Sequence, residues 1–494
     1  MHYATDAVAP SWRPPLGWSL VALVWSYALL TNFDFQPIAV EKLDLVFNDI
    51  ARNVIHLNFT VDRDYIQWEV FVRDGKTYAY FNIFPALIRI PLVFAGVWDL
   101  HVSRMTCIFA LWLGALFNLR LMQLATLRWA GLPGARLVLV CAYGMVIGTG
   151  PAIYTLASAS LYHEALWWAA AFTAGFNVFA LRSFLLGRPL SSWDFVGMAT
   201  TAGGALLCRS SVALALYAGL GVLGCIHAVA LFRNRAVFSR QALLFAAAIV
   251  IASAFLAVQL AVSYARWGDM FASMPLQYYN LLSGPENAVF RDTLTRAGVV
   301  NIARIPYAFV YYFGAINLYE YGPGWLTGIL GGIEGPRILP LLSAPLPILA
   351  GLGGIFTALS RPRLYGRALV VLGINGLSML LMMSFLYVAM RYLMDGWPLF
   401  TVGAAILLRH RASHPGGVRR PQRFILVGLL LLSLAGSHLT LLRYKLVYTG
   451  TDPAVRFALS TSIQPLLCPG KPVRTGVRLT EKDPLVTPGC PPLW

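Results

Sequence analysis

The sequence has little charge, and acidic side chains are especially few. Charged residues make up 12% of the 494 positions, and 21 residues in all are acidic, whereas a soluble globular chain carries about 25% charge. Hydrophobic residues account for 58% of the chain. No water-soluble core is that large, so the composition excludes an ordinary soluble domain and indicates a membrane protein.

Motifs for nucleotides and nucleic acids are also missing. No Gly-rich stretch stands where a strand and a helix could hold a nucleotide, which disfavours a nucleotide-sugar donor. The net charge of +17 alone would suggest nucleic acid, but the arginines lie between apolar runs and outside any RNA-type motif. We therefore expect membrane lipids, and no nucleic acid, among the partners.

Long apolar runs recur along most of the chain. Runs of roughly 18 or more apolar residues predict membrane-spanning helices, because the bilayer core has no water to satisfy exposed backbone groups. Eleven spans are predicted, at residues 16–31, 101–122, 137–157, 165–181, 194–208, 212–231, 242–264, 338–359, 367–390, 397–408 and 424–442. The first follows Arg13 without a small-residue cleavage site behind it, so we expect it to be retained in the protein.

The loops between these spans alternate in charge. With the amino terminus inside, every inner loop is basic, as the positive-inside pattern requires. The inner arginines are Arg128, Arg136, Arg182, Arg188, Arg233, Arg235, Arg240, Arg361, Arg363, Arg367, Arg409, Arg411, Arg419, Arg420 and Arg423. All acidic residues except Asp6 and Asp194 fall outside. We therefore expect a multi-pass protein of a bacterial-type inner membrane with its chemistry on the extracytoplasmic face.

Two apolar stretches do not fit this alternation as spans. Residues 83–98 contain Pro85, Arg89 and Pro91, and counting them as a crossing would move every later basic loop outside. We expect an interfacial or re-entrant helix there, with Arg89 reaching to the headgroups. Residues 302–319 are kept out of the membrane core for the same reason.

The predicted organisation is an all-α transmembrane domain over residues 1–442 and an extracytoplasmic tail over residues 443–494. Two large outer loops interrupt the domain, at residues 32–100 and 265–337. The tail contains Cys468 and Cys490, and an oxidising outer compartment favours a disulfide between them, although two unpaired surface thiols are the alternative. The other four cysteines fall within spans, as small apolar residues.

The first outer loop is much more acidic than a connection between two helices requires. It contains Asp34, Glu41, Asp44, Asp49, Asp62, Asp64, Glu69 and Asp74, interleaved with aromatic residues. Carboxylates at a membrane face can act as a general base or hold a cation, and aromatic planes suit sugar rings. A solvated acidic cap would have the same composition.

Three motifs of this loop resemble the GT-C glycosyltransferases, including the protein O-mannosyltransferases and the lipid A aminoarabinose transferases. They are Phe47-Asn48-Asp49-Ile50-Ala51-Arg52-Asn53-Val54-Ile55, Asp62-Arg63-Asp64 and Tyr78-Ala79-Tyr80-Phe81-Asn82-Ile83-Phe84-Pro85-Ala86-Leu87. The resemblance implies a GT-C-like fold with juxtamembrane helices in the first loop and a polyprenyl-phosphate sugar as donor. It places the catalytic base at Asp49, with Asp34 and Asp44 as alternatives.

The implied reaction is a single displacement at the anomeric carbon, which inverts it. A carboxylate deprotonates the acceptor hydroxyl while the lipid phosphate leaves. Arg391, in a late Arg-Tyr pair that resembles one in the same superfamily, and Arg209 are the candidates for binding this phosphate. Arg209 could equally be a residue that snorkels from a tight outer turn.

A second cluster begins the fourth span, at Tyr162-His163-Glu164. His163 and Glu164 could complete a cation site with Asp62 or Asp64, or bind the acceptor. An interfacial Tyr anchor beside an exposed His and Glu would show the same pattern. A divalent cation is therefore possible, with no diagnostic ligand spacing.

Two other function classes stay open. A transporter or flippase for lipid-linked saccharides should carry ionisable sites near the bilayer midplane, whereas here the acids gather at one surface. A ligase that joins whole glycans would share the outer arginines but would not require so acidic a first loop. The donor sugar is open, and the acceptor could be a lipid, a glycan or a protein.

Overall fold

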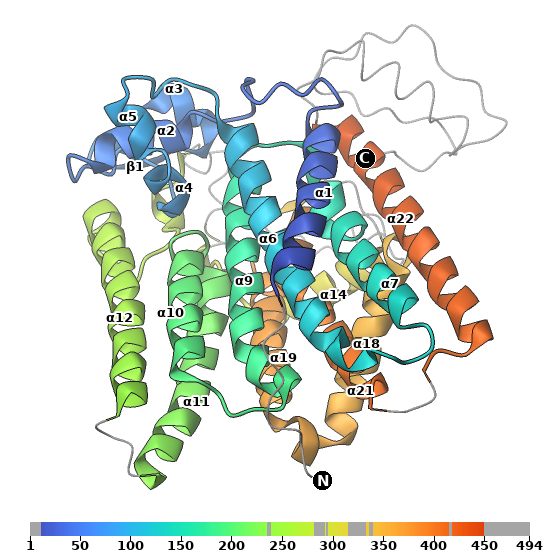
Figure 1. Ribbon diagram of the computed structural model, residues 1–494. Helices are drawn as coiled ribbons and strands as arrows, with labels where there is room; N and C mark the ends of the chain where they lie inside the picture. The colour runs from blue at the N-terminus through green and yellow to red at the C-terminus, as the bar shows by residue number, and fades with distance from the viewer. Residues whose placement is uncertain are drawn as a thin grey trace, which may run out of the picture.

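The computed structural model describes residues 11–234, 239–280, 292, 295–314, 332–334, 339–413 and 417–448. These residues form mainly helices that stand side by side in a bundle (Figure 1). By length and apolar composition, seven of the described helical segments could cross a membrane. They are Ser103–Trp129, Ala135–Ala157, Leu161–Leu186, Ser210–Arg233, Arg240–Trp267, Pro362–Met383 and Arg420–Lys445.

Each of the eleven segments that the sequence predicts as spans overlaps a helix, although the segment 367–390 extends past the end of α19 at Met383 into the strand Tyr387–Ala389. The long ones are α6 (Ser103–Thr126), α7 (Ala135–Gly148) with its continuation, α9 (Leu161–Leu186), α11 (Ser210–Arg233), α12 (Arg240–Trp267), α19 (Pro362–Met383) and α22 (Arg420–Tyr448). The remaining four are α1 (Arg13–Leu30), α10 (Ser192–Leu206), α18 (Pro345–Ser360) and α21 (Pro398–Arg411). These four have 14 to 18 residues each.

Small residues allow the helices of the bundle to approach closely. A Cβ atom on Gly354 of α18 would lie 1.7 Å from the carbonyl oxygen of Gly403 on α21, so these two backbones touch. Between α9 and α19, Asn177 and Asn375 exchange two amide hydrogen bonds, of 3.1 and 3.0 Å. Inside a lipid bilayer the hydrophobic effect does not drive helices together. Close packing and hydrogen bonds between polar side chains hold such a bundle together instead.

The predicted span 137–157 is broken in its last third. α7 ends at Gly148, and Gly150 has φ +76° and ψ −160°, a conformation that is essentially restricted to glycine. The chain resumes as α8 (Pro151–Tyr154) and a 3₁₀ turn (Thr155–Ala157). A Cβ atom on Gly150 would lie 2.4 Å from the Trp397 ring, so glycine is required there by both conformation and space.

The basic loops gather at one end of the bundle, which is the lower end in Figure 1. The loop after α6 meets the loop before α22, where the Val418 amide donates to the Pro133 carbonyl at 3.0 Å. Arg367 donates to the carbonyl of Arg188 at 3.3 Å. The first large loop covers the opposite end.

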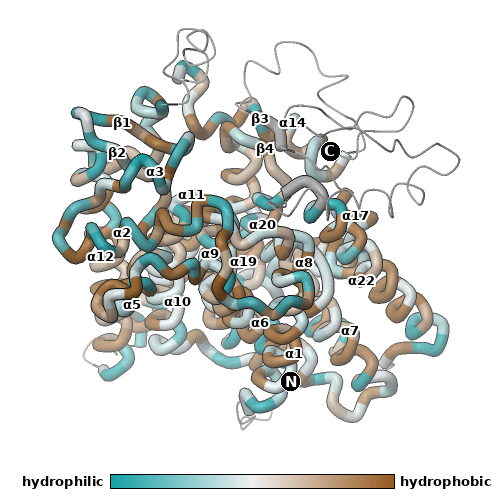
Figure 2. Tube along the Cα trace, turned by 90° about the horizontal axis from the view of Figure 1, so that it is seen from above, coloured by the Kyte–Doolittle hydropathy of each residue, from teal (hydrophilic) through white to brown (hydrophobic). Residues whose placement is uncertain are grey.

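That loop folds into short elements that lie on the bundle (Figures 1 and 2). They are α2 (Val46–Val54), α3 (Arg63–Ile66), the 3₁₀ turn η1 (Gln67–Glu69), β1 (Phe71–Arg73), β2 (Lys76–Tyr78), α4 (Phe84–Leu87) and α5 (Ile90–Phe94). β1 and β2 form an antiparallel hairpin in the register Phe71↔Tyr78, with Asp74 and Gly75 both at positive φ in its turn. Phe47 and Ile50 of α2 are fully buried, in a cluster that includes Leu161 of α9.

Residues 83–98 contain two short helices and no continuous one. α4 and α5 together extend from residue 84 to residue 94, about 16 Å at 1.5 Å per residue, whereas the bilayer core is about 30 Å thick. Pro91 stands at the start of α5 and disfavours helical backbone in the residue before it, which contributes to the break. The first loop therefore contains short helices, and their juxtamembrane position stays a prediction.

The second outer region contributes the short elements η4 (Leu276–Tyr278), η7 (Ile302–Arg304), α14 (Ile305–Phe313) and β3 (Gly332–Glu334). α17 (Pro340–Ser343) precedes α18, and β4 (Tyr387–Ala389), η8 (Met390–Tyr392) and α20 (Leu393–Gly396) connect α19 to α21. β3 and β4 pair in parallel. α22 continues to Tyr448, past the expected start of the tail at residue 443. Cys468 and Cys490 lie outside the described residues.

Candidate functional site

Arg209 and Arg391, which are 182 positions apart in the sequence, meet at one tyrosine ring. Arg209 ends the turn between α10 and α11, and Arg391 belongs to η8. Their guanidinium carbons lie 4.9 and 5.2 Å from the centre of the Tyr392 ring, which is within the range of a cation–π contact. The structure thus brings together the two residues that the sequence suggests for phosphate binding.

Asp395 joins this pair, and the sequence prediction did not include it in the site. Arg209 Nη2 lies 2.7 Å from Asp395 Oδ2, and the carboxylate is almost completely buried. Burial raises the pKa of Asp395, and the adjacent Arg209 acts in the opposite direction. The sequence contains one indication of this role: Asp395 follows Arg391 by four residues, which is about one helical turn.

Glu69, a residue of the first loop, lies in the same cluster as Arg391. The Tyr162 hydroxyl donates to Glu69 Oε1 at 2.6 Å, and the guanidinium of Arg391 lies 4.8 Å from the centre of the Tyr162 ring. Tyr279 also hydrogen-bonds to Glu69. Burial and the charge of Glu69 raise the pKa of Tyr279 and of Tyr80 above their ordinary value, so these phenols stay protonated beside the carboxylate.

The backbone ahead of Glu69 is strained. Asp62 caps α3 by accepting from the Asp64 amide at 3.0 Å, and α3 then ends at Gln67 with φ +53° and ψ −118°. Such a conformation costs a residue with a side chain on the order of 1–3 kcal/mol. Beyond Glu69, the Asn280 amide donates to the carbonyl of Val70 at 3.0 Å. The turn is therefore fixed on both sides of Glu69.

Asp49, the base that the resemblance suggests, lies on the buried face of α2. Its Oδ1 pairs with Arg52 Nη2 at 2.9 Å, and its Oδ2 accepts the amide of Asp62 at 2.7 Å. The side chain is fully buried. Burial raises the pKa of Asp49, while the Asp62 amide and Arg52 act in the opposite direction. The carboxylate ties the loop before α3 to α2.

The two alternative bases, which lie in the first loop, also have partners. Asp44 Oδ2 lies 2.7 Å from His101 Nδ1 and accepts the amide of Glu41 at 2.8 Å. Asp34 is the more exposed of the two and lies 3.8 Å from Arg104.

Glu164 forms a buried bidentate ion pair with Arg89. Arg89 Nη1 and Nη2 lie 2.6 and 2.8 Å from the two carboxylate oxygens, and at most 1% of either side chain is exposed. The expectation that Arg89 extends to the lipid headgroups is therefore wrong. A carboxylate from α9 was available inside the protein, and the pair joins the first loop to the bundle.

The four residues suggested for a cation take part in separate contacts. His163 is buried with Nδ1 2.7 Å from Ser160 Oγ, Glu164 pairs with Arg89, and Asp62 caps α3 with Asp64 exposed after it. Within the described ranges, no group of three or more His, Cys, Asp or Glu residues is placed to hold a metal ion.

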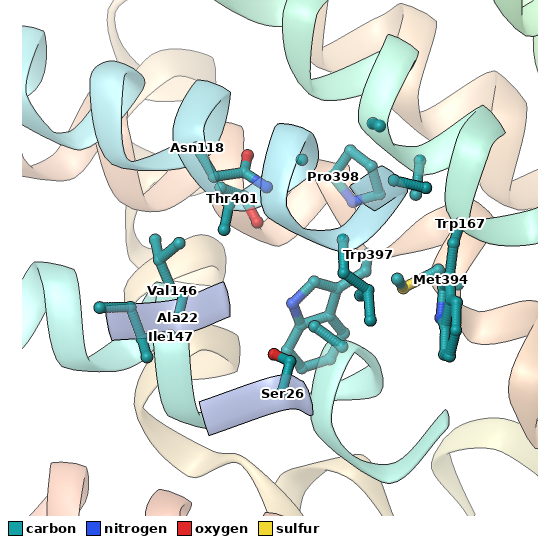
Figure 3. A pocket seen from close by; sticks show the side chains of 17 residues that line it. Ala22, Ser26, Asn118, Val146, Ile147, Trp167, Met394, Trp397, Pro398 and Thr401 are labelled. Atoms are coloured by element: carbon teal, nitrogen blue, oxygen red, sulfur yellow. The ribbon is translucent and has the colours of Figure 1, made fainter. Parts of the chain in front are cut away.

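A cavity of about 70 Å³ lies in the bundle beside the segment that contains Asp395 (Figure 3). Met394 and Trp397 contribute to its lining, and Figure 3 shows the Trp397 indole between Ser26 of α1 and Pro398 of α21. The cavity exists because the residues that α1, α6 and α9 present there include alanines and a glycine, whose side chains are too small to fill it. The 391–397 segment thus borders a polar cluster on one side and a largely apolar cavity on the other.

No family model matches the chain, and no curated protein matches it. Among solved structures, the chain is similar to the oligosaccharyltransferase of Archaeoglobus fulgidus in its apo form, at 14% identity and a TM-score of 0.43 over 92% of this chain. It is similar to the same archaeal enzyme, AglB, in complex with an inhibitory peptide and a dolichol-phosphate, at 14% identity and a TM-score of 0.42 over 92% of this chain. The form tethered to an acceptor peptide gives 13% identity and a TM-score of 0.47 over 91% of this chain. The chain spans 57–58% of the length of these structures.

Proposed function

We propose that this protein is a GT-C-type membrane glycosyltransferase. It moves a sugar from a polyprenyl-phosphate carrier to an acceptor on the outer face of the membrane and inverts the anomeric carbon. The observation that carries the proposal is the meeting of Arg209 and Arg391 at Tyr392, at the end of the bundle that the acidic first loop covers.

Two guanidinium groups are suited to a leaving lipid phosphate. Each presents N–H donors in a plane that matches phosphate oxygens, and stabilises the charge that develops as the bond to the sugar breaks. Asp395 neutralises part of the charge at Arg209 and fixes its direction.

The residues around the two arginines suit the sugar and the hydrocarbon chain of such a donor. Tyr162, Tyr392 and Trp68 offer aromatic planes that can pack against a sugar ring. The apolar cavity bordered by Met394 and Trp397 can take hydrocarbon from the carrier. A ligand with a charged head and an apolar tail fits this combination better than a soluble one.

Sidedness follows from charge. The basic loops gather at the end of the bundle opposite the cluster, and positive loops stay inside. This arrangement supports a site on the extracytoplasmic face, with a glycan, a lipid or a protein as the proposed acceptor.

The test is sugar transfer by the purified protein in lipid with a panel of polyprenyl-phosphate sugars. We expect wild type to turn over at least one donor, and Arg391→Gln to lose about 10²-fold or more in kcat/KM, as for loss of one donor to a developing oxyanion. Arg63→Gln, an exposed arginine on α3, is the matched control. Absence of turnover by wild type with every donor would contradict the proposal.

Asp49 is tested in the same assay, because the sequence resemblance proposes it as the base. If Asp49→Asn transfers sugar as fast as wild type, the base is another carboxylate.

A further inference from the structure

A base in this reaction must be a carboxylate that is near the leaving phosphate and open to an acceptor. Asp49 is fully buried, and Arg52 and the Asp62 amide engage its two oxygens. Glu164 is buried with both oxygens on Arg89. Asp395 pairs with Arg209. These three carboxylates are held in structural contacts.

Glu69 has a different environment. It is only half-buried, and it follows Trp68, whose side chain is 41% exposed. Tyr162 donates to Oε1 at 2.6 Å. The contact from Tyr162 orients the Glu69 carboxylate, and its partial exposure distinguishes it from the three buried carboxylates.

Glu69 is also linked to both phosphate-binding candidates through two rings. Arg391 lies against Tyr162, which bonds to Glu69, and against Tyr392, which also contacts Arg209. The carboxylate and the two guanidinium groups thus belong to one contiguous cluster. This is the arrangement that an inverting transfer needs, with a base on the acceptor side and positive charge on the leaving-group side.

The local backbone holds Glu69 at this place. The strained Gln67 conformation turns the chain sharply after α3, and the pairing of Phe71 with Tyr279 holds the segment that follows. Strain of this kind persists where surrounding structure fixes it, and it clusters at functional sites.

From this geometry we infer that Glu69 is the catalytic base of the transfer reaction, an inference that rests on the proposed function. The Glu69 carboxylate takes the proton of the acceptor hydroxyl as the oxygen forms its bond to the anomeric carbon. The bond between this carbon and the phosphate oxygen breaks, and the lipid phosphate leaves with the electron pair. Arg391 and Arg209 receive the charge.

The experiment compares Glu69→Gln with wild type, using the donor and the hydroxyl acceptor that support transfer by wild type. We expect Glu69→Gln to lose roughly 10²–10⁴-fold in kcat, the usual contribution of a general base, with the KM for the donor little changed. Asp74→Asn is the matched control, because Asp74 is a largely exposed carboxylate in the neighbouring hairpin turn.

Azide as the nucleophile separates a base from a structural residue. Azide carries no proton to remove, so Glu69→Ala should form glycosyl azide from the same donor at close to the wild-type rate while failing with the hydroxyl acceptor. Undiminished hydroxyl transfer by Glu69→Gln, or equal loss of the hydroxyl and azide reactions, would overturn the role of Glu69 and leave the proposed function standing. A wild type that is inactive with every polyprenyl-phosphate sugar would overturn both.

Discussion

Arg89 and Glu164 face each other through two parallel hydrogen bonds in a fully buried ion pair between the first loop and α9. Neither charged group is exposed to water, because both side chains are buried. Removing one partner of such a pair typically costs about 3–5 kcal/mol, while replacing both with apolar residues of similar size is often neutral.

We therefore expect Glu164→Gln to lower the midpoint of thermal unfolding in detergent, and the double variant Arg89→Met/Glu164→Leu to recover much of the loss. If the recovered protein transfers sugar, Glu164 has a structural role and does not bind substrate. A double variant that is stable but inactive would support the binding role that the sequence suggested.

Tyr392 is expected to matter through its ring, because both guanidinium groups lie against it. Tyr392→Leu removes two cation–π contacts of about 0.5–2 kcal/mol each, so the KM for the donor should rise by roughly 5-fold to about 900-fold if the whole loss falls on donor binding. Tyr392→Phe keeps the ring and should stay near wild type. Equal effects of the two substitutions would assign the role to the hydroxyl group instead.

The raised pKa of Asp49 predicts a pH-dependent contribution to stability. Because the folded state raises this pKa above its ordinary value of 3.8, the folded protein holds the proton more tightly than the unfolded chain. The resulting stability is present below about pH 4 and is lost as the pH rises through the folded-state pKa. The measurement is the unfolding midpoint of wild type and of Asp49→Asn at pH values from about 4 to about 8. As the pH rises, the midpoint of the variant should increase relative to that of wild type. A difference between the two midpoints that does not change with pH would contradict the raised pKa.

Gly150 should tolerate no side chain. Gly150→Ala combines a positive φ with a Cβ atom 2.4 Å from the Trp397 ring, so we expect a loss of at least about 1–3 kcal/mol and a lower unfolding midpoint. Gly221→Ala on α11, where a Cβ atom meets nothing within 4 Å, is the matched control and should be neutral or slightly stabilising. The reverse order of stability would contradict the fold around the break after α7.

Sidedness can be tested by labelling single cysteines in a cysteine-free background with a membrane-impermeant maleimide. We expect Asp64→Cys in the first loop to react in intact cells and Arg128→Cys to react only after permeabilisation. Labelling of Arg128→Cys alone in intact cells would invert the proposed topology.

The sequence predicted the helices well because their signal is local. Each apolar run is long and nearly uniform, and the prolines and arginine in residues 83–98 marked a stretch that does not cross as one helix. Arg209 and Arg391 stood out because charge is rare at the ends of such runs.

Pairing between distant residues could not be predicted in this way. Arg89 was expected at the headgroups because residues 83–98 do not fit the alternation of loop charge as a span, whereas its partner Glu164 comes 75 positions later. Glu69 was one acid among nine in its loop, and only the fold singles it out by placing it against Tyr162 of α9. Asp49 matches a family motif, and the same motif serves to hold α2 and the next loop together.

The segment from Arg391 to Trp397 touches the polar cluster with one set of residues and the apolar cavity with another. Its two ends are anchored by the pairing of β4 with β3 and by α21, which begins at Pro398. Under the proposed function, a lipid carrier would place its hydrocarbon against Met394 and Trp397 and its charged group at Arg391, so one short backbone segment would connect the two contacts. Carrier chain length would then influence turnover as well as affinity.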